Sequence, residues 1–470
     1  MRAPTIRDAR LDRSDRRVAG YFANEQGAIV FHVTVEDGRK PRTLRTLELK
    51  AAPGDIGGAL NRLAKELNSS SRSLAGCNGQ ALRRYGDALG GAGDYNAVIE
   101  ADPQCMPAYL SQAENDLAHG DRDGAARACA AALAQPNLNN IDRSELEFLS
   151  ATARNDTAAR LQALRGLASA LPSDTDVLRG MGDLEMAARN IPAAVRSYER
   201  AAQVDPEDGL LWNTLGYARA QAHDLKGAKQ ALQEYQAISS PDDTNALDSL
   251  GEVSFYLGDF RAAENYFLEA NRKNPEALGG REPLKAAEAR MMTGDLAGAD
   301  AILARAHLSP IDAAEWEFIT GRRKKAIARL QPMAQTPAVK VQLLLWNAQT
   351  GNGPVPQSAG AQLSQAVALL LAGKFEAAAP LLEQIYAATN PSADAQVRTL
   401  LAWAYVGSAR PDAARKLLDL YPIPLASGGE ELLASLVFPR FVQLRGQVLG
   451  SEKDRKLAAE YAGDLPDRTP

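Results

Sequence analysis

Residues 189–206 read RNIPAAVRSYERAAQVDP, and three later segments repeat the same pattern. These segments are HDLKGAKQALQEYQAISSP (223–241), GDFRAAENYFLEANRKNP (258–275) and GDLAGADAILARAHLSP (294–310). Each one opens with a turn, continues as an amphipathic helix rich in small residues, and stops at proline. The equivalent alanines lie 34, 35 and 36 residues apart, at Ala194, Ala228, Ala263 and Ala299. A period of this length predicts a helical solenoid.

A second stretch with helical apolar spacing precedes these turns, as in LLWNTLGYARAQA (210–222) and NALDSLGEVSFYLG (245–258). Each unit is therefore predicted to contain helix A, a tight turn, helix B and a short link. Gly216 and Gly251 lie in helix A, where a small residue lets two helix axes approach to about 8–10 Å. Proline ends each unit because it cannot continue a helix.

These positions resemble the tetratricopeptide repeat (TPR) pattern, most specifically over residues 175–310. The matching residues are Trp212, Leu215, Gly216, Ala228 and Tyr235, followed by Leu247, Leu250, Gly251, Gly258, Ala263, Phe267, Ala270 and Pro275. The resemblance implies a mainly α fold, a TPR-like α-solenoid in which helical hairpins form a right-handed superhelix. In such a superhelix, helix A of each unit lines the concave wall.

The repeats extend beyond this region in both directions. Residues 79–350 and 361–470 are predicted to form about ten to eleven hairpins, interrupted at 351–360 by the Gly- and Pro-rich loop GNGPVPQSAG. The last hairpin, at 438–466, has a polar final helix and is predicted to be the cap of the solenoid.

The N-terminal region has a different pattern. Residues 1–17 are interpreted as a polar leader, and residues 18–70 as a small β-β-α module. Within that module, apolar residues alternate along 28–35, Asp37-Gly38 starts a turn into a second strand, and 54–67 has a helical apolar face. The module resembles the second half of a small α/β module that precedes TPR arrays in some bacterial regulators. Its first half and any kinase, cyclase or winged-helix output domain are missing.

Composition excludes several classes of protein. The 53 Lys and Arg residues against 58 Asp and Glu residues give a net charge of −5, which argues against a nucleic-acid partner. The longest apolar run, AVALLLA at 366–372, is far shorter than the roughly 20 residues that span a bilayer. No secretory signal is recognised at the N-terminus, although a start placed downstream would hide one. Three cysteines, Cys77, Cys105 and Cys129, are interpreted as reduced thiols, and the expected location is cytoplasmic.

The sequence offers little catalytic chemistry. The four histidines lack a Cys or carboxylate partner at catalytic spacing, and neither a P-loop nor a nucleophile elbow is present. The basic run RRKK (322–325) is interpreted as a solvated helix face, and the four tryptophans as core residues. Cys129 is expected to be an inert core thiol. We therefore predict no enzyme, with no catalytic, cofactor-binding or metal-binding residues and no cofactor.

The predicted partner-binding surface is the concave face of helix A in successive repeats. The residues placed there are Asn213, Tyr217, Asp248, Glu252, Phe255 and Glu288. Acidic side chains interleaved with Tyr and Phe favour a basic or amphipathic peptide. The alternative is that these carboxylates only keep a long solenoid in solution.

Three functions follow from different classes. The first is a non-catalytic scaffold or adaptor that binds protein or peptide in the concave groove. The second is an orphan regulatory or sensory component that docks a bacterial kinase, cyclase or transcription factor. The third is an enzyme with an unrecognised site in the N-terminal module or in the 351–360 loop. The partner and the oligomeric state are not predicted.

Overall fold

The computed structural model forms two compact units, residues 1–181 and 182–470, and each is considered by itself. The structure describes residues 16–25, 28–37, 43–51, 56–67, 77–136, 138–240, 243–355, 362–389, 394–420, 423–425 and 434–465. Residues 1–15, where most of the predicted polar leader lies, and most of the predicted 351–360 loop are outside the described residues.

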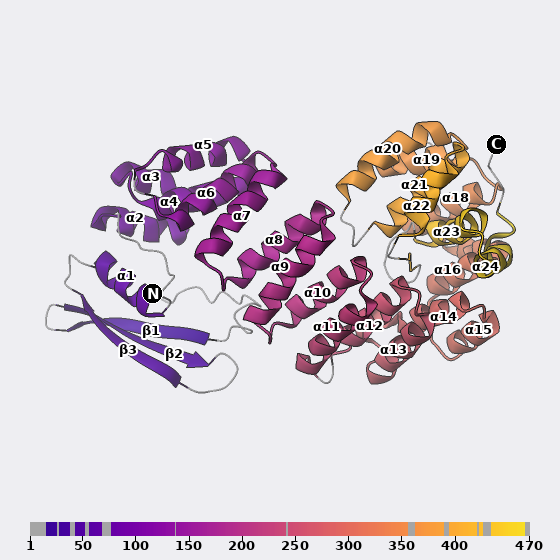
Figure 1. Cartoon of the computed structure of the whole chain (residues 1–470), viewed down its shortest axis with the longest axis horizontal. Coiled ribbons are helices and arrows are strands. Elements are labelled where there is room, and N and C mark those ends of the chain that lie inside the picture. Colours follow the sequence, from indigo (N-terminus) through magenta and orange to yellow (C-terminus); the bar gives the residue numbers. More distant parts are fainter. Residues whose placement is uncertain are drawn as a thin grey trace. The chain divides into compact units, whose positions relative to one another are not determined.

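The first unit begins with a three-stranded antiparallel sheet in the order β1-β2-β3 (Figure 1). The strands are β1 (Arg16–Glu25), β2 (Ala28–Asp37) and β3 (Thr43–Ala51), and helix α1 (Ile56–Leu67) packs against β3. The sequence pattern predicts only the last two strands and the helix, so the hairpin is corrected to a three-stranded sheet. β1 escapes prediction because RRVAGYFANE contains glycine and asparagine and has no regular apolar alternation.

Helices follow to the end of the first unit. They are α2 (Gly79–Leu89), α3 (Tyr95–Ala101), α4 (Met106–Ala118), α5 (Arg122–Leu133), α6 (Asn140–Ala153) and α7 (Thr157–Ala170). Helix α8 (Thr175–Ala187) crosses from the first unit into the second. The first hairpin is compressed, because its second helix, α3, has only 7 residues.

The second unit continues the array. Its helices are α9 (Ile191–Val204), α10 (Gly209–Gln221), α11 (Leu225–Ile238), α12 (Asn245–Tyr256), α13 (Phe260–Lys273), α14 (Glu282–Met292), α15 (Leu296–Leu303), α16 (Pro310–Ile319), α17 (Arg323–Leu330), α18 (Pro337–Gln349), α19 (Gln362–Leu371), α20 (Phe375–Ala388), α21 (Ala395–Gly407), α22 (Pro411–Leu418), α23 (Ala434–Val448) and α24 (Glu452–Ala462). In the described residues α18 has no helix B of its own, since the next helix is α19, the first helix of the following hairpin.

The turn from helix A to helix B is built in the same way in several repeats. A residue with positive φ ends the first helix, and an aspartate follows and caps the second. The pairs are Gly120-Asp121, Asn155-Asp156, His223-Asp224, Gly258-Asp259 and Gly294-Asp295. Each aspartate accepts a hydrogen bond from a backbone N–H in the first turn of its helix, which satisfies a donor that has no partner within the helix. The turns therefore fix the 35-residue period locally.

Close packing within a hairpin explains the helix A glycines. A Cβ atom on Gly182 would lie 2.5 Å from the ring of Tyr198, and one on Gly216 would lie 2.6 Å from Leu232. The same clash would occur between Gly251 and the ring of Phe267. The expectation that these positions must be small is confirmed.

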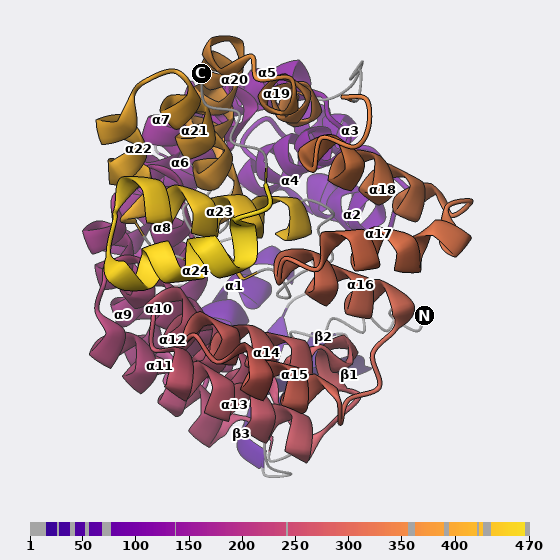
Figure 2. The ribbon, with the colours of Figure 1, turned by 90° about the vertical axis from the view of Figure 1, so that its right-hand side faces the viewer.

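The last hairpin of the second unit differs from an ordinary solenoid cap. Helix α23 is buried around most of its circumference, and contacts α16, α18, α21 and α22 as well as α24. Figure 2 shows α23 and α24 side by side, between α21 and α22 above and α12 and α14 below. Residues 434–442 of α23 are all buried, so this part of the helix belongs to the core of the unit.

Candidate functional site

The six residues predicted to line the groove lie on three successive A helices. Asn213 and Tyr217 are on α10, Asp248, Glu252 and Phe255 are on α12, and Glu288 is on α14. The structure joins three of them in one polar cluster. Tyr217 donates a hydrogen bond to Glu252 (2.7 Å), and Lys285 of α14 contacts both Asp248 (2.6 Å) and Glu252 (2.9 Å).

Lys285 is not among the residues predicted from the sequence, yet it holds this cluster together. It lies 37 residues after Asp248 and 33 residues after Glu252, which is one repeat further along the array. A basic residue one period after two acidic residues, all on helix A, is the signal that the sequence offers. The three residues meet because successive A helices stack side by side.

Two of the three predicted carboxylates, Asp248 and Glu288, are buried. Asp248 is 8% exposed, while Phe255 and Glu288 are completely buried. Asn213 and Tyr217 are half-buried, and so is Glu252. Asp248 is enclosed with Lys285 between neighbouring A helices, and later residues contact the ends of α12 at Tyr256 and of α14 at Met291. The contacts with these later residues cannot be read from a pattern with a period of 35 residues.

Burial changes the acid–base properties of the cluster. Burial, together with the neighbouring charge of Glu252, raises the pKa of Asp248 to about 6, although Lys285 acts in the opposite direction. Burial raises the pKa of Tyr217 well above its ordinary value, and the charge of Glu252 adds to this effect. For Lys285, burial alone would lower the pKa, but the charges of Glu252 and Asp248 raise it. The cluster is therefore an internal ion pair at neutral pH.

Several contacts join the last two helices, α23 and α24, to earlier repeats. The indole N–H of Trp346 on α18 donates to Ser435 at the start of α23 (3.3 Å), and Gln349 donates to the carbonyl of Leu436 (2.9 Å). Further along, the hydroxyl of Tyr461 on α24 donates to the carbonyl of Met291 at the end of α14 (3.3 Å). The last two helices are thus attached to α14 and α18 of the earlier repeats.

A second contact joins the beginning of the second unit to its later repeats. Arg189, in the turn before α9, donates to Asp394 (2.7 Å) and to the carbonyl of Tyr386 (2.7 Å), and stacks 4.1 Å from the ring of Tyr386. Asp394 is buried and also accepts a hydrogen bond from Arg398 (2.6 Å). Arg189 and Tyr386 are 197 positions apart in sequence, so the array of this unit returns on itself.

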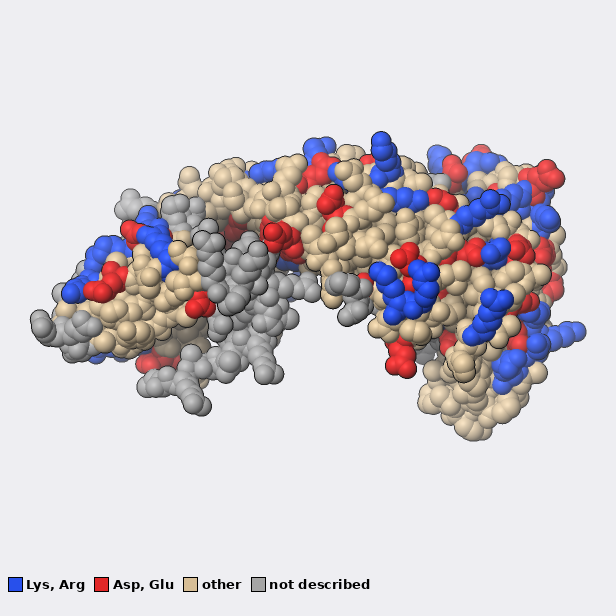
Figure 3. Space-filling view, turned by 90° about the horizontal axis from the view of Figure 1, so that it is seen from below, with Lys and Arg blue, Asp and Glu red and all other residues tan. Residues whose placement is uncertain are grey.

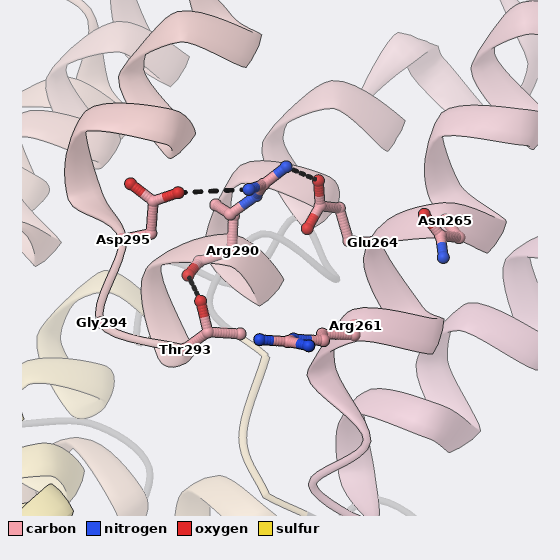
Figure 4. Close-up of a pocket in the computed structure, with 7 residues that line it drawn as sticks. All are labelled: Arg261, Glu264, Asn265, Arg290, Thr293, Gly294 and Asp295. Carbon is pink, nitrogen blue, oxygen red and sulfur yellow. Dashed lines mark hydrogen bonds and ion pairs between the residues drawn. The ribbon is translucent and has the colours of Figure 1, made fainter.

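A surface cavity of about 450 Å³ lies beside the turn between α14 and α15 (Figure 4). Arg290 lies against it and is paired with Glu264 (2.6 Å) and Asp295 (3.1 Å). Arg261 extends toward Thr293 and is exposed. Because the two arginines are balanced by two carboxylates, the cavity has no net charge. On the face of the second unit seen in Figure 3, basic and acidic side chains are likewise interspersed.

The cysteines correct another expectation. Cys77 and Cys105 form a disulfide with a Cα–Cα distance of 4.3 Å, and Cys105 is completely buried. The sequence indicates separate reduced thiols, because a separation of 28 positions conceals that α2 and α4 begin side by side. Cys129 is the buried core thiol that the sequence predicts, and burial raises its pKa to about 11.

The basic run at 322–325 also differs from the predicted solvated face. Arg322 pairs with Asp300 (3.0 Å) and Lys325 with Glu317 (3.0 Å). Arg323 is 2% exposed and donates to the carbonyl of Tyr461 (2.5 Å). Arg323 therefore binds the last described helix, whereas Lys324 and Lys325 are exposed, as the sequence predicts.

The tryptophans agree with the prediction in three of four cases. Trp316, Trp346 and Trp403 are buried, whereas Trp212 is half-buried and donates to the carbonyl of Pro206 (2.8 Å). Among the described residues, no group of His, Cys, Asp and Glu side chains is arranged to hold a metal ion. Within the same residues, every helix is too short or too polar to span a membrane.

Known proteins share this repeat. Residues 369–428, which contain α20, α21 and α22, match the family model described as tetratricopeptide repeat. This segment is a tetratricopeptide repeat. The matched segment has the same two-helix units as the region around 175–310, which carries the TPR pattern in the sequence. No curated protein matches the sequence.

Solved structures of TPR proteins align with parts of the chain. The MamA protein is 17% identical, with coverage of 42% of this chain and 96% of MamA at a TM-score of 0.32. PilW, a type IV pilus biogenesis factor, is 16% identical, with 49% and 98% covered and a TM-score of 0.35. A tetratricopeptide repeat protein from Parabacteroides merdae ATCC 43184 is 15% identical, with 64% and 98% covered and a TM-score of 0.37.

Proposed function

We propose that this TPR protein is a non-catalytic scaffold or adaptor that binds another protein. The observation that carries the proposal is the array of helix pairs itself, since stacked repeats present side chains over a surface far larger than any single pocket. Solenoid proteins use such extended surfaces for binding.

The binding surface that we favour is the groove face of α10, where Asn213 and Tyr217 lie. Helix α10 packs on α9, α11 and α12. A later part of the chain contacts the next A helix, α12, where the backbone N–H of Ile423 donates to the carbonyl of Tyr256. The side-chain oxygen of Asn213 is buried and has no hydrogen-bond partner in the described structure, so it can accept one from a ligand. Glu252 adds a negative charge beside Tyr217, which supports a preference for a basic or amphipathic segment.

The test is affinity capture with a matched pair of variants. Asn213→Arg places a large cation on the groove face of α10, whereas Gln233→Arg places the same cation on the exposed side of α11 in the same hairpin. We expect a captured protein that binds wild type and Gln233→Arg but is lost with Asn213→Arg. The same captured set for both variants would reject the α10 surface. Asp248 is unsuitable for this purpose, because a lysine there would face Lys285 in a buried site.

The disulfide bears on where the scaffold works. We propose an oxidising compartment for it, since a disulfide such as Cys77–Cys105 persists there and is reduced in the cytosol. Alkylation of the protein during cell lysis, followed by mass spectrometry, tests this. Alkylation of Cys77 and Cys105 would show that both thiols are reduced in the cell, which would contradict the proposed oxidising compartment.

A further inference from the structure

The N-terminal sheet has two edges, and they differ in how they are protected. β3, at one edge, carries Arg45, Glu48 and Lys50 at short intervals. Its pairing with β2 is also interrupted by a register shift at Val35/Glu36. Charges and bulges are the features by which natural edge strands avoid pairing with another chain.

β1, at the other edge, has neither protection. Between Val18 and Ala23 it reads VAGYFA, without a charge, a proline or a register shift. Val18, Tyr21 and Phe22 are 53%, 67% and 72% exposed. Because successive residues of a strand point to opposite faces, Tyr21 and Phe22 expose aromatic rings on both sides of the sheet.

Helix α1 does not cover this strand. It is fixed on β3, where the Arg45 guanidinium donates to the carbonyl of Glu66 (2.9 Å) and pairs with the Glu66 carboxylate. The register places Phe22 opposite Phe31 and Phe31 opposite Leu49, so all three share the face on which α1 lies. Phe22 is at the end of that row and stays exposed. Within the part of the chain that the structure describes, this edge is apolar between Val18 and Ala23, carries no charge there and is not paired with another strand. Such an edge is a site for strand addition.

We propose that β1 pairs antiparallel with β1 of a second copy of this chain. The charges at the ends of the strand argue for this occupant, because Arg16 and Arg17 open it and Glu25 closes it. Antiparallel pairing of two identical strands sets the positive end of each against the negative end of the other. A parallel arrangement would set like charges together.

The geometry of a continuous sheet fixes the register. A two-fold axis perpendicular to the sheet keeps each face on the same side, so odd residues pair with odd residues and even with even. Centring the axis on Tyr21 brings Arg17 opposite Glu25 at both ends, and Tyr21 opposite its own copy. In this register Phe22 lies opposite Gly20, which has no side chain to obstruct the ring. The result is a six-stranded sheet in which both β3 strands form the protected outer edges.

One added strand pair buries a small area, so the dimer is expected to be weak and dependent on concentration. Favourable cross-strand pairs are each worth about 0.2–1 kcal/mol, and the two-fold axis makes every pair except Tyr21–Tyr21 occur twice. This inference does not depend on the proposed scaffold function, because β1 and α10 belong to different units of the chain.

Charge reversal gives the first test. Arg17→Glu and Glu25→Arg each place like charges opposite one another, and we expect each to weaken dimerisation about tenfold in analytical ultracentrifugation. Mixing the two variants restores opposite charges at both ends of the strand pair, because each reversed position then faces a partner of the other sign. The mixture therefore dimerises as wild type does, and the double variant is rescued for the same reason. Circular dichroism checks that every variant is folded.

A cysteine at the two-fold axis gives the second test. In the proposed register the Cβ atoms at position 21 lie about 5 Å apart, so Tyr21→Cys forms an intermolecular disulfide on mild oxidation. Leu44→Cys, at another exposed position of the sheet on β3, is the control and stays monomeric on a non-reducing gel. A wild-type chain that is monomeric at about 200 μM, well above the roughly micromolar range of weak specific complexes, would overturn the proposal. Cross-linking at Leu44→Cys alone, or dimerisation unaffected by the charge reversals, would do the same.

Discussion

The Nζ atom of Lys285 lies 2.6 Å from an Oδ atom of Asp248, and both side chains are buried between α12 and α14. Lys285 also contacts Glu252, so one ammonium group compensates two carboxylates. Buried charges contribute little to stability as a complete set, but removing one partner leaves the others without compensation. The cluster is therefore a sensitive position in the second unit.

We expect Lys285→Met to lower the free energy of unfolding by about 3–5 kcal/mol, because Asp248 and Glu252 would remain buried without a cation. Chemical denaturation measures the loss. The matched control is Lys324→Met, which removes the same charge from an exposed position of α17 and should change stability by less than about 0.5 kcal/mol. Equal effects of the two substitutions would contradict the role given to Lys285.

The raised pKa of Asp248 predicts a dependence of stability on pH. Its pKa is about 6 in the folded chain against 3.8 for an ordinary aspartate, so the folded state binds the proton more tightly. The contribution is complete below about pH 4 and is lost as pH rises to about 6, a change of about 3 kcal/mol. Asp248→Asn lacks this change. The stability of the variant relative to wild type should therefore increase between about pH 4 and about pH 7, and a constant difference would show that Asp248 titrates normally.

The Cys77–Cys105 disulfide should stabilise the first helices. Its ends are 28 residues apart, and closing a loop of that length is worth about 3–4 kcal/mol in the unfolded chain. We expect reduction to increase amide hydrogen exchange in α2, α3 and α4 more than in α12 to α24, because repeats transmit instability mainly to their neighbours. In a Cys77→Ser/Cys105→Ser variant the exchange should be fast with or without reductant.

Two glycine substitutions with opposite outcomes test the packing of the hairpins. Gly251→Ala adds a methyl group against the ring of Phe267 and should cost about 1–3 kcal/mol through overpacking. Gly86→Ala adds the same group in α2, where nothing lies within 4 Å, and should stabilise the helix by up to about 1 kcal/mol. Thermal unfolding of both variants measures whether each substitution lowers or raises the stability of the protein. Stabilisation by Gly251→Ala would show that α12 and α13 are less closely packed than described.

Sequence alone predicts the repeat because its determinants are local. A positive-φ residue followed by a capping aspartate, as at Gly258-Asp259, and a glycine opposite a ring, as at Gly251 and Phe267, occur within a single unit. Their spacing can be read without knowing any distant contact. The A and B helices from α9 to α15 are predictable for that reason.

The candidate site is less predictable because its burial depends on distant residues. Phe255 and Glu288 belong to helix A faces that a regular solenoid exposes in its groove. Here the segment that contains Ser435 and Tyr461 contacts α18 at Trp346, 89 residues earlier, and α14 at Met291, 170 residues earlier. No periodic pattern encodes such a contact. The role of Lys285 is easier to predict than this burial and harder to predict than the turns. Its partners lie one repeat away, so its position can be found by comparing neighbouring units.

The buried position of α23 affects how the chain is made. During synthesis Trp346 leaves the ribosome 89 residues before Ser435, its hydrogen-bond partner at the start of α23. At a translation rate of about 5–20 residues per second, the apolar faces that receive α23 stay uncovered for roughly 4–18 seconds. A nascent chain of this length therefore exposes apolar surface to chaperones and proteases, and a ribosome that stalls before α23 releases a product whose earlier repeats lack their interior helix.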